Sequence, residues 1–561
     1  MTAARRILLI ALAIVAPLAL IAAAVVLWVW AGVRSGVSVP SGTLTGFALR
    51  APVEIVRDAR GIPHIRARNE HDLFFTEGYV EGTDRLFQLD LYRRLVEGRL
   101  AEVFGSAALQ SDIAARRIDA QGIAAAEERA LPPRERVDLA AFAAGINAAI
   151  ATRPLPPEFR MLGYRPERFR ARDALVVSLA TVLALSDSWY DVANRAAVVA
   201  ALGPRGADAF FSISDPRYDT PTVGGPPAPV APLPPLAVRF PTATGLSIAE
   251  RSAGYSVGGS NAYAAGAALT HGGRALLAND PHLQLRIPGI WYLVDLAAPG
   301  FAVEGATLAG VPGVILGHNA HLAWGATNGT VATVRVFRET FDGPSSDRYR
   351  AGSGWLTAQK RTERFLVRFG APVSRTYLRT RHGFVFEDDG ATKLVAAWTS
   401  DLDGRSGYTA FDALDRAGTV GQALRALAHY PGPPQNFVLA DDRGEAAYAL
   451  AGEIWRDGTW GLGIEDGVAA PPVRLAPIPF RALPQVPPGR KVFAITANAR
   501  MYGRGYPYRL SAAFEPPYRA AELARDLRAR PHALAQFAAA QLDVHSLPEA
   551  ELAADAVAAL A

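Results

Sequence analysis

The hydrophobic period of this chain changes from helical to strand-like in the middle of the sequence, and a proline-rich stretch marks this change. From about residue 70 to about residue 200, apolar residues recur every three or four positions, as in helices packed on one face. From residue 260 they alternate with a period of two between glycine, proline and Asn-Asp turns, which is typical of short strands. Residues 221–241 lie between these parts and contain eight prolines, so they form neither a helix nor a central strand. Helical patterns return at about residue 519, and the expected fold class is α+β.

Individual elements follow from the same patterns. Residues 53–56 and 62–67 flank a turn and predict a β-hairpin, and helices are expected over residues 138–151 and 173–186. The 561 residues are too many for one ordinary core, so we expect more than one folding unit. A mostly antiparallel sheet system is expected after residue 260. Its predicted strands lie at residues 261–264, 275–278, 291–296, 313–317, 321–324, 364–369, 374–378, 394–398, 435–440 and 492–497.

The N-terminus predicts a membrane anchor. Residues 7–33 carry no charge and are flanked by Arg6 and Arg34. About 20 apolar residues span a bilayer, whereas a secretory signal has a core of roughly 7–15 residues. Ala22-Ala23-Ala24 resembles a cleavage site, but the apolar run continues beyond it, so an uncleaved transmembrane helix is favoured over a cleaved signal. The positive-inside rule places the body of the chain outside the cytoplasm, on the periplasmic or cell-surface side.

Composition excludes several classes of function. The net charge is +5 and the arginines are scattered, without a basic stripe interleaved with aromatic residues, so nucleic acid is not an expected partner. The chain contains no cysteine, which excludes disulfides, thiolate nucleophiles and cysteine-ligated zinc.

Two serines compete as nucleophile. Gly254-Tyr255-Ser256-Val257-Gly258 matches the G-x-S-x-G elbow of esterases of the α/β-hydrolase class. That motif requires a buried strand before the serine and a helix after it, but a polar segment precedes Ser256 and Gly258-Gly259 follows it. Ser260 has another chemistry available, because an N-terminal serine carries its own base, an α-amine with a pKa of about 7.7–8.0. Gly259 has no side chain, so a strained turn there exposes its carbonyl to the Ser260 hydroxyl. On these residues alone, a common Gly-Ser-Asn loop remains an alternative.

A set of ordered motifs separates these alternatives, and through them the chain resembles the penicillin acylase family of N-terminal-nucleophile hydrolases. The resemblance covers nearly the whole chain after the anchor. It rests on Arg57-Asp58-Ala59-Arg60-Gly61-Ile62-Pro63-His64-Ile65, Glu77-Gly78-Tyr79-Val80, Asp84-Arg85-Leu86-Phe87-Gln88-Leu89-Asp90, Gly98-Arg99-Leu100-Ala101-Glu102, Gly259-Ser260-Asn261-Ala262-Tyr263, Leu277-Ala278-Asn279-Asp280-Pro281-His282-Leu283, Gly310-Val311-Pro312-Gly313, Gly317-His318-Asn319, Ala323-Trp324-Gly325 and Ala497-Asn498.

The resemblance implies a four-layer αββα sandwich and an autocatalytic cut between Gly259 and Ser260. Residues 41–220 would form the α chain, residues 221–259 a spacer removed on processing, and residues 260–561 the β chain. The implied reaction is hydrolysis of a small-molecule N-acyl amide through an acyl-enzyme. The family's β chains usually run further, so the chain is expected to be a fragment or a shortened member whose C-terminal part is missing.

The resemblance also assigns site residues. Ser260 matches the nucleophile, Asn498 the side-chain donor of the oxyanion hole, and Asn328 the residue whose backbone N–H is the second donor. His282 matches a position that orients the amine or a bridging water, and Arg519 an arginine that supports Asn498. Without the family pattern, a turn residue, a surface histidine and a salt bridge would be the simpler interpretations of Asn498, His282 and Arg519.

Substrate and metal expectations come from the same matches. The acyl-pocket positions are Leu185, Leu283 and Leu316, whose aliphatic side chains favour a fatty-acyl or other linear acyl amide, such as an acyl-homoserine lactone or lipopeptide, or a β-lactam-like amide. No cofactor is required. Many family members bind calcium between their two chains, and Asp191 matches one ligand. The two further carboxylate positions hold Ala332 and Arg335, which argues against calcium here, since calcium takes about six to eight oxygen ligands.

Three hypotheses therefore stand. The first is a membrane-tethered, self-cleaving amidohydrolase that uses Ser260, and the second is an esterase that uses Ser256. The third is an unprocessed, non-catalytic member of the family.

Overall fold

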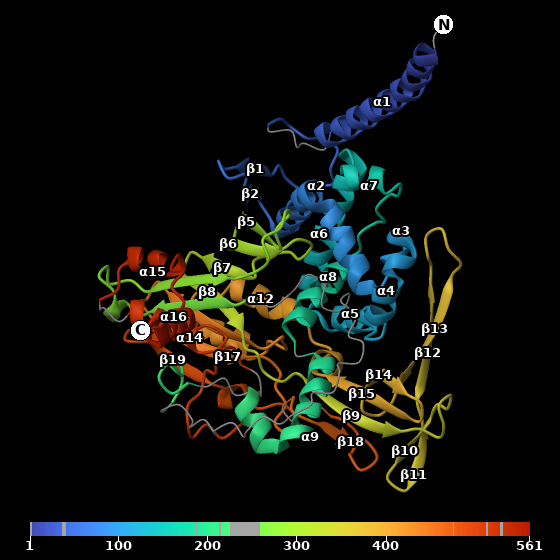
Figure 1. The fold of residues 1–561 in the computed structure, drawn as a ribbon. Helices are drawn as coiled ribbons and strands as arrows, with labels where there is room; N and C mark the ends of the chain where they lie inside the picture. The colour runs from blue at the N-terminus through green and yellow to red at the C-terminus, as the bar shows by residue number, and fades with distance from the viewer. Residues whose placement is uncertain are drawn as a thin grey trace.

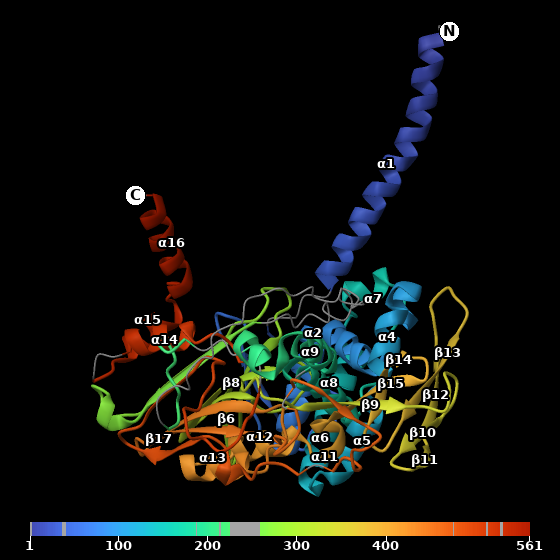
Figure 2. The same cartoon turned by 60° about the horizontal axis from the view of Figure 1, so that its bottom comes forward.

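A computed structural model describes residues 3–35, 41–186, 188–211, 215–224, 258–459, 461–474, 476–511, 514–527 and 531–560. The first helix, α1 (Ala3–Ser35), leads away from the body of the molecule in both views (Figure 1, Figure 2). Near its end, Gly32 lies against Pro157 and Arg160 of the short helix α7 (Pro157–Met161). Residues 12–32 of α1 are long and apolar enough to cross a membrane, and none of their most apolar window is buried. A second stretch, residues 171–203, passes the same test, but its first helix is part of the protein core.

A helical block follows the hairpin, and α2 (Glu70–Glu97) and α6 (Pro133–Thr152) form its centre. Glycines bring these two helices close: a Cβ at Gly78 would lie 2.0 Å from the Phe142 carbonyl oxygen. The Asn69 side chain accepts the N–H of Asp72 at the start of α2, and Gly98 ends the helix in the left-handed conformation. The other helices of the block are α3 (Ala101–Phe104), α4 (Leu109–Arg116), α5 (Ala120–Ala130), α7, α8 (Ala171–Leu185) and α9 (Trp189–Phe211), with the 3₁₀ turn η1 (Gly105–Ala108).

The largest sheet has nine strands in the order β1-β2-β5-β6-β7-β8-β16-β17-β19. All neighbours are antiparallel except β2 and β5, which are parallel. One face of this sheet packs with α2, α12 and α13 in a single large core that includes Phe74, Trp324, Leu414, Leu427 and Phe437. The strands are β1 (Glu54–Arg57), β2 (Pro63–Arg66), β5 (Trp291–Ala298), β6 (Phe301–Leu308), β7 (Leu316–Asn319), β8 (Leu322–Asn328), β16 (Gln435–Asp441), β17 (Ala446–Ala451) and β19 (Gln485–Gly489).

A three-stranded sheet packs on the other face of the large sheet, in the order β20 (Phe493–Thr496), β3 (Ser260–Ala265), β4 (Leu276–Pro281). Because side chains alternate along β3, Ala262 and Ala264 point toward Val438 and Tyr448 of the large sheet. Tyr263 and Ala265 point the other way and are covered by helices α14 (Tyr518–Asp526) and α15 (Leu534–Gln541). Ser260, at the start of the central strand β3, is thus held between a sheet and a pair of helices.

A third sheet lies at the far side of the molecule from α15 (Figure 1). Its six strands have the order β12-β13-β14-β15-β9-β18, and a separate hairpin, β10-β11, lies next to it. The strands are β9 (Val334–Thr340), β10 (Arg348–Ala351), β11 (Gly354–Thr357), β12 (Gln359–Phe365), β13 (Val373–Arg379), β14 (Phe384–Asp389), β15 (Thr392–Trp398) and β18 (Ile464–Asp466). The remaining elements are α11 (Thr399–Asp403), α12 (Gly407–Asp415), α13 (Val420–Leu427), α16 (Leu547–Leu560), η2 (Ala267–Leu269) and η3 (Phe480–Ala482).

The structure confirms the α+β class, the N-terminal hairpin and the two predicted helices, which are α6 and α8. The strand predicted at residues 313–317 is wrong in its bounds, because β7 begins only at Leu316. Residues 313 and 314 instead form a loop: Gly313 has φ +85°, and the N–H groups of Gly313 and Val314 are bound by carboxylates of α2 and α12.

Candidate active site

Ser260 lies where the chain enters β3, and its backbone nitrogen is bound to a side chain rather than to a neighbouring strand. The Ser260 N–H donates to Asn498 Oδ1 over 2.7 Å. Asn498 follows β20, is 2% exposed, and has a left-handed φ of +65°, a conformation that asparagine tolerates better than most residues. The Thr330 hydroxyl and the Glu515 N–H donate to its carbonyl oxygen, both over 3.2 Å. Asn498 is therefore fixed in place on both its backbone and its side chain.

Arg519, in the first turn of α14, joins these groups. Its Nη1 donates to the Ser260 carbonyl and to Asn261 Oδ1, each over 2.8 Å, and its Nη2 donates to Asn498 Oδ1 over 2.9 Å. Burial lowers the pKa of Arg519 from its ordinary value, but an arginine starts so high that the guanidinium stays charged. A fixed positive charge therefore lies beside the Ser260 backbone.

The amide group of Asn498 also contacts Asn328, at the end of β8. Asn498 Nδ2 donates to the Asn328 carbonyl over 2.9 Å. The Asn328 side chain donates to the Leu185 carbonyl over 3.1 Å, which joins β8 to the end of α8. The structure thus brings together four predicted site residues, Ser260, Asn328, Asn498 and Arg519.

His282 approaches the same place with its backbone. Its N–H donates to the Gly259 carbonyl over 2.7 Å. Its ring Nε2 lies 2.7 Å from Asp280 Oδ2 and 3.3 Å from Asn261 Nδ2. Asn261 and Asp280 were not predicted as site residues, although both belong to motifs that carry the family resemblance, so their positions in those motifs were the available signal.

The two glycines before Ser260 are required by close packing. A Cβ at Gly258 would lie 1.5 Å from the His282 carbonyl oxygen, and one at Gly259 would lie 2.6 Å from the Arg519 guanidinium carbon. Distances this short are not found between real atoms, so any side chain here would displace His282 or Arg519. This turn therefore requires glycine at both positions for lack of space, and not only for backbone flexibility.

An apolar cavity of about 150 Å³ opens at Ser260. The three predicted pocket residues, Leu185, Leu283 and Leu316, all line it, together with Asn328. The cavity is not lined by aliphatic residues alone, because aromatic side chains from later parts of the chain also contribute. They are Trp291, Tyr408, Phe411, Tyr430 and Phe437. No local sequence pattern marks these residues as pocket residues, since they are brought in by β5, β16 and the helical connection between β15 and β16.

One wall of the cavity, the loop between β6 and β7, rests on three buried carboxyl groups. Glu81 accepts a hydrogen bond from the Gly310 N–H over 2.7 Å. Glu77 accepts one from the Gly313 N–H over 2.9 Å, and Asp415 accepts one from the Val314 N–H over 3.1 Å. Burial raises the pKa of each of these three carboxyls well above its ordinary value. For Glu77, the neighbouring Glu81 raises it further.

The residues at the expected calcium positions do not fit the ion. Asp191 lies exposed on α9, and Ala332 offers no side-chain oxygen. Arg335 places a positive charge where the ion would bind. Its Nε donates to Glu465 Oε1 over 2.8 Å, and its guanidinium lies over the rings of Phe337 and Trp455. We assign no role to a metal at this position.

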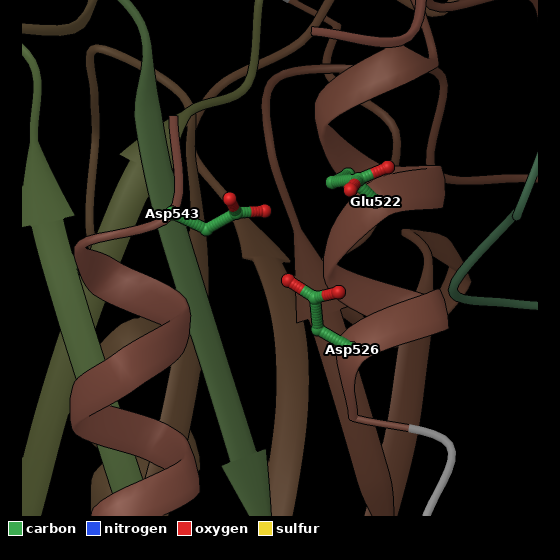
Figure 3. A group of neighbouring side chains, drawn as sticks. All are labelled: Glu522, Asp526 and Asp543. Carbon is green, nitrogen blue, oxygen red and sulfur yellow. The ribbon is translucent and has the colours of Figure 1, made fainter. Parts of the chain in front are cut away.

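A separate acidic group is formed by α14 and the connection between α15 and α16 (Figure 3). Glu522, Asp526 and Asp543 each bring a carboxylate oxygen to within 4.8 Å of the others. Burial and the neighbouring Asp543 raise the pKa of Asp526 above its ordinary value. Arg525 and His545 both contact Glu522, with His545 Nδ1 3.0 Å from Glu522 Oε1. Neighbouring basic side chains of the same segment therefore contact this acidic group.

The competing nucleophile, Ser256, and most of the expected spacer lie outside the described residues, so the esterase motif has no described geometry.

Sequence comparison places the chain in a family. The penicillin amidase family model matches residues 52–560, and the chain belongs to the penicillin amidase family.

Individual relatives fall into two groups. "Penicillin acylase 2 proenzyme" from Pseudomonas sp. is 32% identical over 521 residues, which are 88% of this chain and 64% of the relative. "Acyl-homoserine lactone acylase QuiP" from Pseudomonas aeruginosa is 28% identical over 439 residues, 74% of this chain and 51% of the relative. "Penicillin G acylase" from Escherichia coli is 27% identical over 409 residues, 63% and 48% of the two chains. The chain thus spans between 48% and 64% of the length of these three relatives.

Among solved structures, the thermostable penicillin G acylase from Alcaligenes faecalis in its orthorhombic form matches 48% of this chain and 49% of its own, with 22% identity. Its TM-score of 0.41 is too low to support an argument about the fold.

Proposed function

We propose that this chain is the precursor of an amide hydrolase that cuts itself between Gly259 and Ser260 and then uses Ser260 as an N-terminal nucleophile. One observation carries the proposal: the Ser260 nitrogen, which becomes the α-amine, is bound by Asn498 and flanked by Arg519 at the mouth of an apolar cavity. The name "proenzyme" of one relative agrees with such processing.

The contacts of Gly259 support self-cleavage by an N→O acyl shift. Ser260 Oγ attacks the Gly259 carbonyl carbon, and the His282 N–H, 2.7 Å from the carbonyl oxygen, stabilises the developing negative charge. The C–N bond then breaks as the hydroxyl proton reaches the Ser260 nitrogen. Water hydrolyses the resulting ester, which leaves a Gly259 carboxylate and a Ser260 with a free hydroxyl and a free α-amine.

The same groups serve the reaction with substrate. The α-amine of Ser260 takes the hydroxyl proton as Oγ attacks the acyl carbon, and it returns the proton to the leaving amine. Asn498 Nδ2 and the Asn328 N–H are the proposed oxyanion donors, each worth about 10²–10³ in kcat. Arg519 holds Asn498 and the Ser260 backbone in position, and the His282 ring, paired with Asp280, orients a water or the amine. Water then releases the acyl group.

The proposed substrate is a small N-acyl amide with an apolar acyl group. Leu185, Leu283 and Leu316 suit a linear acyl chain, and the aromatic residues opposite them also accept a ring by stacking. The relatives' names agree with both, since they include penicillin acylases and acyl-homoserine lactone acylases.

For the whole chain we propose an α chain of residues 41–220, a removed spacer of residues 221–259 and a β chain from Ser260, packed as a four-layer αββα sandwich. The core clusters on the two faces of β3 and the large sheet support this layering. We propose further that residues 7–33 anchor the protein in the membrane, with the body outside the cytoplasm, as the exposed apolar surface of α1 supports.

Mass spectrometry of the intact purified protein tests self-cleavage. We expect two chains, the larger one beginning Ser260-Asn261, and we expect one uncut chain for both Ser260→Ala and Gly259→Ala. Ser256→Ala is the matched control and should process and hydrolyse N-acyl amides normally. An uncut wild-type chain that loses activity with Ser256→Ala would establish the esterase, and an uncut chain without activity would establish the non-catalytic alternative.

A further inference from the structure

The loop between β4 and β5 exposes two large apolar side chains beside the cavity. Leu283, at the start of this loop, lines the cavity. Arg286 turns inward, where its guanidinium lies over the Tyr92 ring and donates to the Tyr92 hydroxyl. Leu285 and Ile287 therefore point outward, and their relative exposures are 103% and 102%. Full exposure of two neighbouring aliphatic side chains at the entrance to an apolar cavity calls for a partner.

Packing contacts connect this loop, through α2, to the helix that the end of α1 contacts. Arg85 and Gln88 of α2 donate to the Gly289 carbonyl over 3.0 and 2.9 Å, which fixes the end of the loop on one turn of α2. The ring of Phe87, in the same turn, packs edge-on against Phe159 of α7, with 5.4 Å between ring centroids. Helix α7 is also the element that Gly32 of α1 contacts. One turn of α2 thus connects the loop to the point where α1 leaves the body.

The surface around α7 has the composition of a membrane-contacting surface. Arg160, Arg165 and Arg168 are exposed there, and so is Met161. Exposed arginines attract anionic lipid headgroups, and exposed apolar side chains beside them can enter the acyl region. Leu285 and Ile287 add two such side chains at a place where α1 already brings a bilayer close.

We propose that residues 283–289 dock on the bilayer that holds α1, with Leu285 and Ile287 inserted among the lipids. The cavity then opens toward the membrane surface, and its substrates are long-chain N-acyl amides that partition into the membrane. This inference rests on the anchor and the amide hydrolysis proposed above. A protein partner is the other candidate occupant of the loop, but the packing connection to the end of α1 favours lipid.

The absence of cysteine permits a clean test of insertion. The full-length protein, as Ile287→Cys labelled with an environment-sensitive fluorophore, is reconstituted in phosphatidylcholine–phosphatidylglycerol vesicles. Leu356→Cys is the matched control, because Leu356 is exposed on β11, in the hairpin that lies at the end of the molecule away from α1 (Figure 1, Figure 2). We expect a blue-shifted emission at residue 287 that spin-labelled lipids quench, and neither effect at residue 356. Water-like emission at both positions would overturn the proposal, and so would a blue shift without quenching, which would indicate a protein contact.

Kinetics in the same vesicles test the substrate class. The double variant Leu285→Ser/Ile287→Ser should lower kcat/KM about tenfold for an N-dodecanoyl amide. This loss is smaller than the free energy of burying two aliphatic side chains in lipid would allow. It should leave the rate for a water-soluble N-acetyl amide unchanged, as should Leu356→Ser for both substrates. Equal losses for both substrates would contradict delivery from the membrane. Because the fluorescence measurement needs no activity, a wild-type protein that hydrolyses neither amide would contradict the proposed function alone.

Discussion

At the scale of single residues, Asn498 combines two roles that a mutation can separate. Its left-handed backbone shapes the turn after β20, and its side chain contacts Ser260, Asn328 and Arg519. Glycine adopts the same backbone without strain, whereas alanine does not.

We expect Asn498→Gly to fold and to lose about 10²–10³ in kcat, because the side-chain donor is removed while the backbone conformation is kept. Asn498→Ala should lose as much activity and also about 1 kcal/mol of unfolding free energy from backbone strain. Steady-state kinetics on the processed enzyme and thermal unfolding check both. Normal activity in Asn498→Gly would exclude the residue from the oxyanion hole.

At the scale of elements, the loop between β6 and β7 depends on Glu77, Glu81 and Asp415. Their folded pKa values are raised by burial, so their contribution to stability is complete at low pH, below their unfolded pKa values, and is lost as the pH rises through the folded values. The resulting charges would repel one another below the cavity wall.

Glu81→Gln keeps an oxygen for the Gly310 N–H and stays neutral at every pH. We expect its unfolding temperature to fall less steeply than that of the wild type between about pH 5 and about pH 9. Glu304→Gln, a change at an exposed carboxylate, serves as control and should follow the wild-type curve. Parallel curves for wild type and Glu81→Gln would show that folding does not raise the pKa of Glu81.

Elements whose pattern is local were predictable from the sequence, and elements defined by tertiary contacts were not. The alternation in residues 261–264 predicted β3, and the helical period predicted α6 and α8. The strand expected at residues 313–317 failed because carboxylates from distant helices capture its N–H groups. Helices α12 and α13 are short and lie between strands, and no prediction marked them. Leu185, Leu283 and Leu316 were placed at the cavity by family resemblance, but the aromatic walls come from residues with no shared motif.

At the scale of the whole molecule, the proposed α and β chains must stay together after the cut. Helix α9 joins them on one side, where Arg195 donates to the Gly461 carbonyl over 2.7 Å and α9 packs along β9 and β18. The partly buried ion pair between Arg335 and Glu465 joins β9 to β18 at this place. A guanidinium therefore stands where the family resemblance led us to expect a calcium-binding carboxylate.

We therefore expect a chelator to change neither the unfolding temperature nor the co-elution of the two chains. Arg335→Ala should lower the unfolding free energy by about 3 kcal/mol, because it leaves the mostly buried Glu465 without its cation. Arg348→Ala, which removes an exposed arginine paired with Asp342, is the matched control and should cost less than about 1 kcal/mol. A chelator that lowers the unfolding temperature, or separates the chains, would mean that a metal outside the Arg335 position holds the two chains together, and the search for it would begin with Glu522, Asp526 and Asp543.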